Sequence, residues 1–251
     1  MTTVAVLCDP PRPGVVLPEL VETSPLAPEE AADLYAAMLG DVARAVADSG
    51  GELLINYRPD DALPDTDADP DPDAEARLRA VVGTALGDPD AARFEVQVGE
   101  TFAGRAGNTA THLLEREEVG TVAVVEPTAP FLARSHVDNA AMKLRRSEAV
   151  LGSSTRGRVY YAGFAEPIDF EGAYTPPAVE TLTDRGLDAG LEVDFLPTLP
   201  VVETGTDLVD ALTLLRARRR AGRIVPERTA DCLDDLGVAV VEQGGDLELA
   251  R

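Results

Sequence analysis

The chain has 251 residues, of which 45% are hydrophobic, so it can bury a full core in one large domain or two small ones. Its 45 Asp and Glu residues outnumber its 22 Lys and Arg residues, and the formal net charge is -23 at pH 7. This charge argues against nucleic acid and anionic membranes as partners, because both bind positively charged surfaces. We interpret the acidity as adaptation to a salt-rich cytoplasm, where ions screen the repulsion.

The first half of the chain alternates short apolar runs with longer Ala-rich segments of helical periodicity. Acidic residues open the first of these helices, as the helix dipole favours. The pattern predicts strands at 4–8, 52–57, 93–98 and 121–126, and helices at 28–48, 75–86, 105–117 and 130–146. The acidic run DTDADPDPD (65–73) lacks the central Gly and final Glu of an EF-hand, so we expect a solvated loop there and no calcium site.

The second half continues the alternation. Strands are predicted at 148–153 and 159–164, joined by a short polar turn, then a helix at about 177–189, a strand at 191–196 and a helix capped by Thr204 or Thr206. Residues 216–251 form a predicted C-terminal extension with a helix and a strand. Strands that alternate with helices predict a single domain over 1–251, a three-layer α/β/α sandwich with a mostly parallel sheet.

The location is predicted from what the sequence lacks. The N-terminus shows no secretory signal pattern, and no apolar run approaches the roughly 18 residues of a membrane span. Cys8 and Cys232 are far apart in the sequence and lack metal-ligand spacing. We therefore expect a cytoplasmic protein with reduced cysteines.

Five segments in chain order carry a resemblance. They are DPPRPGVVLPEL, QVGETFAGR, EPTAPFL, VLGSSTRGRVYYAGF and VETGTDL. Together they resemble the motifs of the glycosyltransferase-like family associated with radical-SAM and selenium genes, a distant relative of phospholactate and molybdopterin guanylyltransferases. The likeness spans about residues 3–215. The positions that match are Pro11, Pro13, Gly14, Leu20, Gln97, Gly99, Gly104, Arg105, Pro130, Leu132, Leu151, Gly152, Tyr160, Tyr161, Gly163, Thr204, Asp207 and Leu208.

The resemblance implies a fold of the GT-A (nucleotide-diphospho-sugar transferase) type, with a metal-held nucleotide diphosphate over the loop after the first strand. The charged positions depart from the family pattern. The family's basic residues in the first loop correspond to Asp9, Leu17 and Glu19, and its metal-binding Asp after the fourth strand corresponds to Thr128. The Asp before its Gly-Gly pair falls on Thr155 or Arg156. We therefore expect no metal site and no cofactor, and Mg²⁺ or Mn²⁺ only if transferase activity is retained.

Ligands of open α/β sheets bind at the carboxyl ends of the strands. The loop Asp9–Leu20 and the turn Ser153–Val159 are expected to face each other across the ends of the first and fourth strands. Their arginines could then form a metal-free anion site, since guanidinium groups bind phosphate and carboxylate bidentately. The alternative is that each arginine pairs with a surface acid. The candidate ligand-binding residues are Arg12, Pro13, Gly14, Arg105, Glu126, Thr128, Arg156, Arg158 and Glu203.

Three functions remain open from the sequence. The first is a degenerate transferase that binds a nucleotide, a nucleotide sugar or another anionic small molecule without catalysis or without metal. The second is an active nucleotidyltransferase or glycosyltransferase with a site rebuilt around arginines. The third is a scaffold subunit of a protein complex, with the fold retained and a protein as partner.

Overall fold

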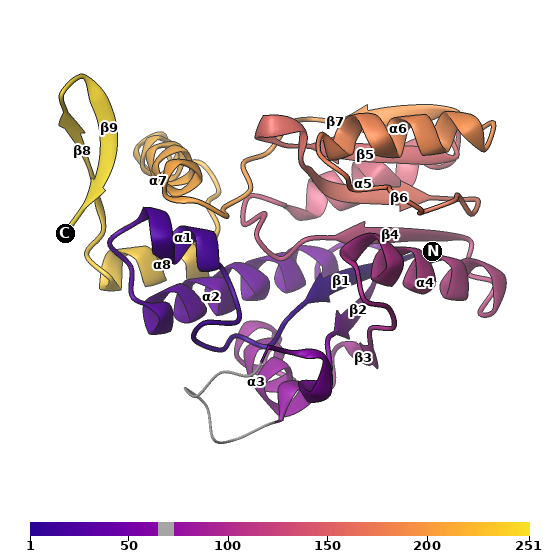
Figure 1. Cartoon of the computed structure of the whole chain (residues 1–251), viewed down its shortest axis with the longest axis horizontal. Coiled ribbons are helices and arrows are strands. Elements are labelled where there is room, and N and C mark those ends of the chain that lie inside the picture. The colour runs from indigo at the N-terminus through magenta and orange to yellow at the C-terminus, as the bar shows by residue number, and fades with distance from the viewer. Residues whose placement is uncertain (65–72) are drawn as a thin grey trace.

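A computed structural model describes residues 1–64 and 73–251 (Figure 1). The acidic loop predicted at 65–73 lies outside the described residues, apart from Asp73. Asp73 caps the helix that follows, because its side chain accepts a hydrogen bond from the backbone N–H of Ala76.

A seven-stranded sheet forms the centre of the molecule, in the order β3-β2-β1-β4-β6-β5-β7. Strand β6 runs antiparallel to β4 and β5, and the other neighbouring pairs are parallel. The predicted mostly parallel sheet is confirmed. Its strands are β1 (Thr2–Cys8), β2 (Glu52–Tyr57), β3 (Arg93–Val96), β4 (Thr121–Val125), β5 (Ala149–Ser153), β6 (Val159–Phe164) and β7 (Val193–Leu196).

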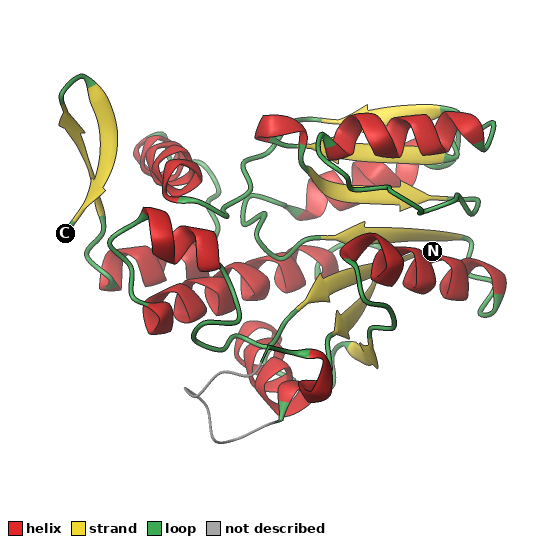
Figure 2. Ribbon diagram, in the orientation of Figure 1, coloured by secondary structure: helices red, strands yellow, loops and turns green. Residues whose placement is uncertain are grey.

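Helices cover both faces of this sheet (Figure 2). One face carries α1 (Pro18–Thr23), α2 (Pro28–Ala47), α3 (Ala74–Leu86), α5 (Arg134–Lys143), α7 (Gly205–Arg220) and α8 (Glu227–Asp235). The other face carries α4 (Phe102–Glu115) and α6 (Ala178–Asp188). The three-layer α/β/α sandwich predicted from the alternation of strands and helices is therefore present.

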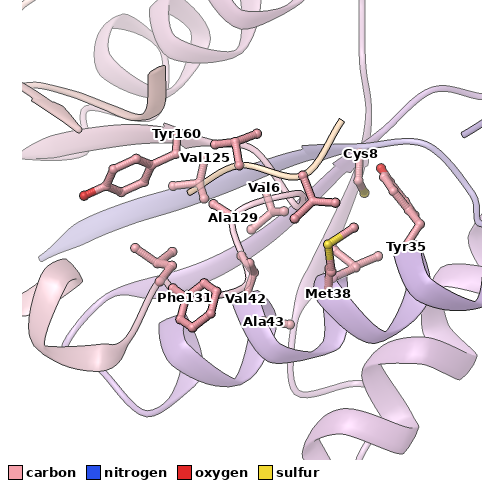
Figure 3. Packing of buried hydrophobic residues seen from close by; sticks show 14 of the residues in the cluster. Val6, Cys8, Tyr35, Met38, Val42, Ala43, Val125, Ala129, Phe131 and Tyr160 are labelled. Atoms are coloured by element: carbon pink, nitrogen blue, oxygen red, sulfur yellow. The ribbon is translucent and has the colours of Figure 1, made fainter. Parts of the chain in front are cut away.

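Strand β1 shows how alternation builds the two layers of core. Val4 and Val6 pack on the α2 face, whereas Ala5 and Leu7 pack on the α4 face. Side chains of successive strand residues point to opposite faces, so a strand buried on both sides must be apolar throughout. Figure 3 shows Met38 of α2 among the apolar side chains of the first layer.

Helix α5 begins later than predicted, at Arg134 instead of 130. A turn precedes it, in which the backbone N–H of Leu132 donates to the carbonyl of Ala129 at 3.0 Å. Phe131 and Leu132 are buried by this turn. Phe131 and Leu132 are apolar because this turn is buried, and that is why the sequence pattern resembled the start of a helix.

Two further elements were not predicted. They are the short helix α1 and strand β9 (Asp246–Ala250), which pairs with β8 (Ala239–Gln243) as an antiparallel hairpin beyond the sheet (Figure 1). Among the described residues, none of the helices has both the length and the apolar character needed to cross a membrane.

Helix α8 is anchored by a buried acid on another helix. The carboxylate of Asp41 in α2 accepts hydrogen bonds from the backbone N–H of Arg228 at 3.2 Å and of Thr229 at 2.8 Å, and from the Thr229 hydroxyl at 2.7 Å. The first N–H groups of a helix have no partner inside the helix. Asp41 therefore caps α8 from 187 and 188 residues away in the sequence, and joins the C-terminal extension to the rest of the fold.

Asp41→Ala should lower the free energy of unfolding by about 2 kcal/mol, since it leaves buried N–H and hydroxyl groups of α8 without partners. The measurement is urea denaturation in high salt. Asp48→Ala is the control, because Asp48 ends the same helix with its side chain 52% exposed. Equal effects of the two substitutions would contradict the capping role of Asp41.

Candidate functional site

A cavity of about 510 Å³ opens at the carboxyl ends of β1 and β4. Its volume falls within the roughly 300–1,000 Å³ of small-molecule sites. The loop after β1 and the turn before β6 both line it, as the sequence predicted for facing segments. The lining residues are Leu7, Cys8, Asp9, Val15, Val16, Leu17, Pro18, Glu19, Tyr35, Gln97, Phe102, Arg105, Glu126, Pro127, Thr128, Arg156, Gly157, Arg158, Val159, Tyr174, Pro176, Ala178 and Glu203.

The wall at the end of β1 is held by paired polar groups. The carboxylate of Asp9 accepts two hydrogen bonds of 2.5 Å from the guanidinium of Arg58, which follows β2. The backbone N–H of Asp9 donates to the Tyr35 hydroxyl at 3.0 Å. The Gln97 amide donates to the carbonyl of Cys8 at 3.2 Å. The negative charge of Asp9 is thus neutralised by a fixed partner.

Arg105 lies in the first turns of α4, beside this pair. Its Nη1 donates to the carbonyl of Glu100 at 3.0 Å, and its buried Nε has no hydrogen-bond partner among the described residues. Burial lowers the pKa of Arg105, and the nearby charge of Arg58 lowers it further. The carboxylate of Asp9 is paired with Arg58, so the positive charge of Arg105 has no carboxylate partner among the described residues and faces the cavity.

Arg158, at the start of β6, is tied to two acids. Its Nη1 donates to Glu203 at 2.8 Å and its Nη2 donates to Asp207 at 2.6 Å. Burial favours a higher pKa for Asp207, but hydrogen bonds from Arg158 and Thr204 outweigh it and lower that pKa. Asp207 also caps α7, where it accepts from the backbone N–H of Thr204 at 3.0 Å. Arg158 is thus a structural clamp, and its charge is neutralised.

Arg156 stands at the tip of the turn between β5 and β6. Its φ of 58° lies in the left-handed region, and its side chain is exposed beside the cavity. Within the part of the chain that the structure describes, no carboxylate pairs with it. Together with Arg105, it is a cation available to a ligand.

Polar groups without partners gather at the end of β4. Glu126 is half-buried, and burial together with the charge of Glu203 raises its pKa to about 8, against the opposing effect of Arg158. The hydroxyls of Thr128 and Tyr174 are buried and make no hydrogen bond to any described residue. Burial, with a contribution from Glu126, raises the pKa of Tyr174. This corner of the cavity is polar but carries little charge at neutral pH.

The structure brings together six of the nine candidate ligand-binding residues. Those that line the cavity are Arg105, Glu126, Thr128, Arg156, Arg158 and Glu203. The other three, Arg12, Pro13 and Gly14, are not among the lining residues.

Arg12 is turned toward Asp60 and forms an ion pair with it, and its carbonyl accepts from the backbone N–H of Val15 at 3.1 Å. This turn presents the segment 15–19 to the cavity instead. The alternative of pairing with acids therefore holds for Arg12, as it does for Arg158.

Several residues at or beside the cavity were not predicted from the sequence, among them Arg58, Phe102 and Tyr174. Arg58 directly follows β2, the parallel neighbour of β1, and an arginine at that strand end was a usable signal. Phe102 opens α4, and Tyr174 lies in the loop after β6 with a φ of 65°. The sequence around Tyr174 carries no signal for its role, because a long loop brings it back over the sheet.

The described carboxylates are not grouped as a protein-only metal site would require. Within residues 1–64 and 73–251, no group of three or more His, Cys, Asp and Glu side chains is arranged to hold a metal ion. Glu126 and Glu203 are close enough for the charge of Glu203 to raise the pKa of Glu126.

Solved structures show the same fold. A protein from Desulfovibrio desulfuricans G20, assigned as a nucleotide-diphospho-sugar transferase, matches with a TM-score of 0.75 and 21% identity, covering 94% of this chain and 96% of that one. A 4-diphosphocytidyl-2C-methyl-D-erythritol synthase from Anaerococcus prevotii DSM 20548 matches with a TM-score of 0.51 and 13% identity, covering 86% and 96%. CMP:2-keto-3-deoxy-manno-octonic acid synthetase in complex with CTP matches with a TM-score of 0.50 and 12% identity, covering 86% and 99%.

Neither a protein-family model nor a curated protein sequence matches the chain. The structural likeness therefore concerns the architecture. The predicted fold class is confirmed, because the chain has the mostly parallel α/β fold of the GT-A, nucleotide-diphospho-sugar transferase type.

Proposed function

We propose that this chain binds a nucleotide, a nucleotide sugar or another phosphate-bearing small molecule in the cavity at the ends of β1 and β4. The phosphate lies between Arg105 and Arg156. The observation that carries the proposal is Arg105, a half-buried guanidinium that faces the cavity without a carboxylate partner among the described residues. The likeness to a synthetase that holds CTP supports a nucleotide-type ligand.

The electrostatics favour an anion in spite of the charge of the whole protein. A concave site with low-dielectric walls concentrates the field of the few charges that line it. Asp9 and Glu203 are each paired with an arginine, so they oppose an incoming phosphate less than free carboxylates do. Each charge-assisted hydrogen bond from an arginine then contributes about 1.5–3 kcal/mol.

We further propose that binding needs no metal and that transfer chemistry is lost. Thr128 stands where the resembled family has its metal-binding acid, and a lone hydroxyl is a poor ligand for Mg²⁺. Arg158 is committed to Glu203 and Asp207. The protein would act as a binding or regulatory protein in the cytoplasm of a salt-adapted cell.

The experiment is a thermal-shift titration in high salt with pyrophosphate and nucleoside triphosphates, with and without Mg²⁺. A ligand at 100 times its Kd stabilises the fold by about 2.7 kcal/mol, which is easily detected. Arg105→Gln should weaken pyrophosphate binding at least tenfold. Arg116→Gln, at the exposed end of the same helix, is the control with the same change of charge and should have no effect.

Wild-type protein that gains no stability from any of these phosphates would overturn the proposal. A second function is favoured by one observation, the proximity of Glu126 and Glu203 at the cavity. Mg²⁺ binds through one or two carboxylates together with phosphate oxygens. A shift that requires both a nucleoside triphosphate and Mg²⁺ or Mn²⁺ would therefore favour an active nucleotidyltransferase or glycosyltransferase.

A further inference from the structure

We propose that Glu126, Thr128 and Tyr174 form a subsite for the hydroxyl groups of a sugar or polyol at the end of β4. The ligand would then be a phosphorylated sugar or polyol, free or as part of a nucleotide sugar. This inference rests on the proposed function, because it extends the phosphate site at Arg105 and Arg156 into the adjoining corner of the same cavity.

The first observation is the pair of buried hydroxyls. Thr128 is only 8% exposed, and its Oγ1 makes no hydrogen bond to a described residue, although it lies on the cavity wall. The Tyr174 hydroxyl is buried and unpaired in the same way. A buried polar group without a partner is unfavourable, because it has lost its hydrogen bonds to water. Ligand hydroxyls at this corner would supply partners to both groups.

The backbone fixes the position of Thr128. Its carbonyl accepts from the N–H of Val202 at 2.9 Å, which ties the end of β4 to the segment that carries Glu203. Tyr174 packs edge-on against Phe102 at a centroid distance of 4.8 Å. The two hydroxyls are thus held by the fold, and the aromatic pair supplies an apolar wall for the C–H groups of a sugar ring.

The third member, Glu126, makes no side-chain hydrogen bond to any described residue. With a pKa near 8, it is mostly protonated at neutral pH. A carboxylic acid, a threonine and a tyrosine can each donate and accept one hydrogen bond. This mixture matches alcohols, which also donate and accept. A metal ion or an ammonium group needs acceptors with negative charge, and Glu126 carries little negative charge at neutral pH.

Charged groups from two segments act on the pKa of Glu126, namely Glu203, which precedes α7, and Arg158, which directly precedes β6. Tyr174, in the loop after β6, is close enough for Glu126 to raise its pKa. Arg158 is already bound to Glu203, which limits the repulsion between that acid and a phosphorylated ligand. The corner is therefore close to neutral, which suits uncharged hydroxyl groups.

The test compares two probes, pyrophosphate and glucose 1-phosphate, by calorimetric titration in high salt. Wild-type protein should bind glucose 1-phosphate through both parts of the cavity. Tyr174→Phe and Thr128→Val each remove one hydroxyl at nearly constant shape. We expect each to weaken glucose 1-phosphate binding about tenfold and to leave pyrophosphate binding within twofold, whereas Arg105→Gln should weaken both.

The protonation of Glu126 gives a second readout. Between pH 7.5 and 9.5, Glu126 loses its proton, which removes a donor and adds repulsion, so glucose 1-phosphate binding should weaken by on the order of tenfold. The phosphate is already fully ionised in this range, since its second pKa is about 6. Glu126→Gln should bind with little pH dependence.

The outcomes separate the two proposals. If pyrophosphate binds but Tyr174→Phe and Thr128→Val bind glucose 1-phosphate as the wild type does, the hydroxyl subsite is overturned and the phosphate site stands. If neither probe binds the wild type, both are overturned. UDP-glucose that binds much more tightly than glucose 1-phosphate would assign the sugar to a nucleotide sugar. Melting temperatures without ligand verify that each variant folds.

Discussion

We expect the midpoint of thermal unfolding to rise by on the order of 10 °C as KCl is raised from about 0.1 M to about 1 M, since the Debye length falls from about 10 Å to about 3 Å. Even if every cation had its own acid, 45 minus 22 leaves 23 carboxylates without a positive partner. Their repulsion destabilises the compact state until salt screens it. Differential scanning calorimetry across a KCl series provides the measurement.

The shape of the curve identifies the cause. Screening is steepest at low salt, because the Debye length changes most there. Exclusion of salt from the protein surface instead strengthens apolar burial in proportion to concentration. A steep rise that levels off by about 1 M supports repulsion between acids. A melting temperature that does not change with KCl, or that rises linearly up to the highest KCl concentration, would refute the salt-adapted interpretation. It would direct attention to a cationic partner.

The strands could be predicted well from sequence, and the physical reason is their burial. Strands β2 and β6 lie at the predicted bounds, and both are buried along almost their whole length. The β3 strand ends at Val96, two residues before the predicted end, because it lies at the edge of the sheet where pairing stops. Strand β9 (DLELA) does alternate charged and apolar residues, but it is short and mostly exposed, and it was not recognised as a strand.

The candidate site was predicted only in outline. Loop positions after strands follow from topology, so Glu126 and Thr128 could be placed at the cavity. Side-chain direction could not, since it depends on which acid lies within reach. Asp60 holds Arg12 away from the cavity, and Glu203 and Asp207 neutralise Arg158. In a chain so rich in acids, the arginines that point to a ligand site are those without a carboxylate partner among the described residues.

Arg158→Ala should lower the free energy of unfolding by about 3 kcal/mol at neutral pH and high salt, since removal of one partner leaves a buried charge uncompensated. The Asp207 side chain is 5% exposed and that of Arg158 is 17% exposed, so water can replace little of the lost contact. Asp207 keeps its hydrogen bonds to Thr204, which holds the loss at the lower end of the range for buried pairs. Urea denaturation of wild type and Arg158→Ala measures this loss of unfolding free energy.

Arg156→Ala is the matched control, because Arg156 lies two residues away with the same charge and no carboxylate partner in the described part of the chain. Its effect on the free energy of unfolding should stay within about 0.5 kcal/mol.

The stabilisation by Arg158 should also depend on pH in a defined direction. The folded pKa of Asp207 is lowered, so the clamp stabilises the fold above the unfolded pKa of about 3.9 and is lost as pH falls through the lower folded pKa. The difference between wild type and Arg158→Ala should therefore shrink below about pH 4. A difference that persists at pH 2 would mean that Arg158 stabilises the fold by packing its alkyl chain and not by holding Asp207.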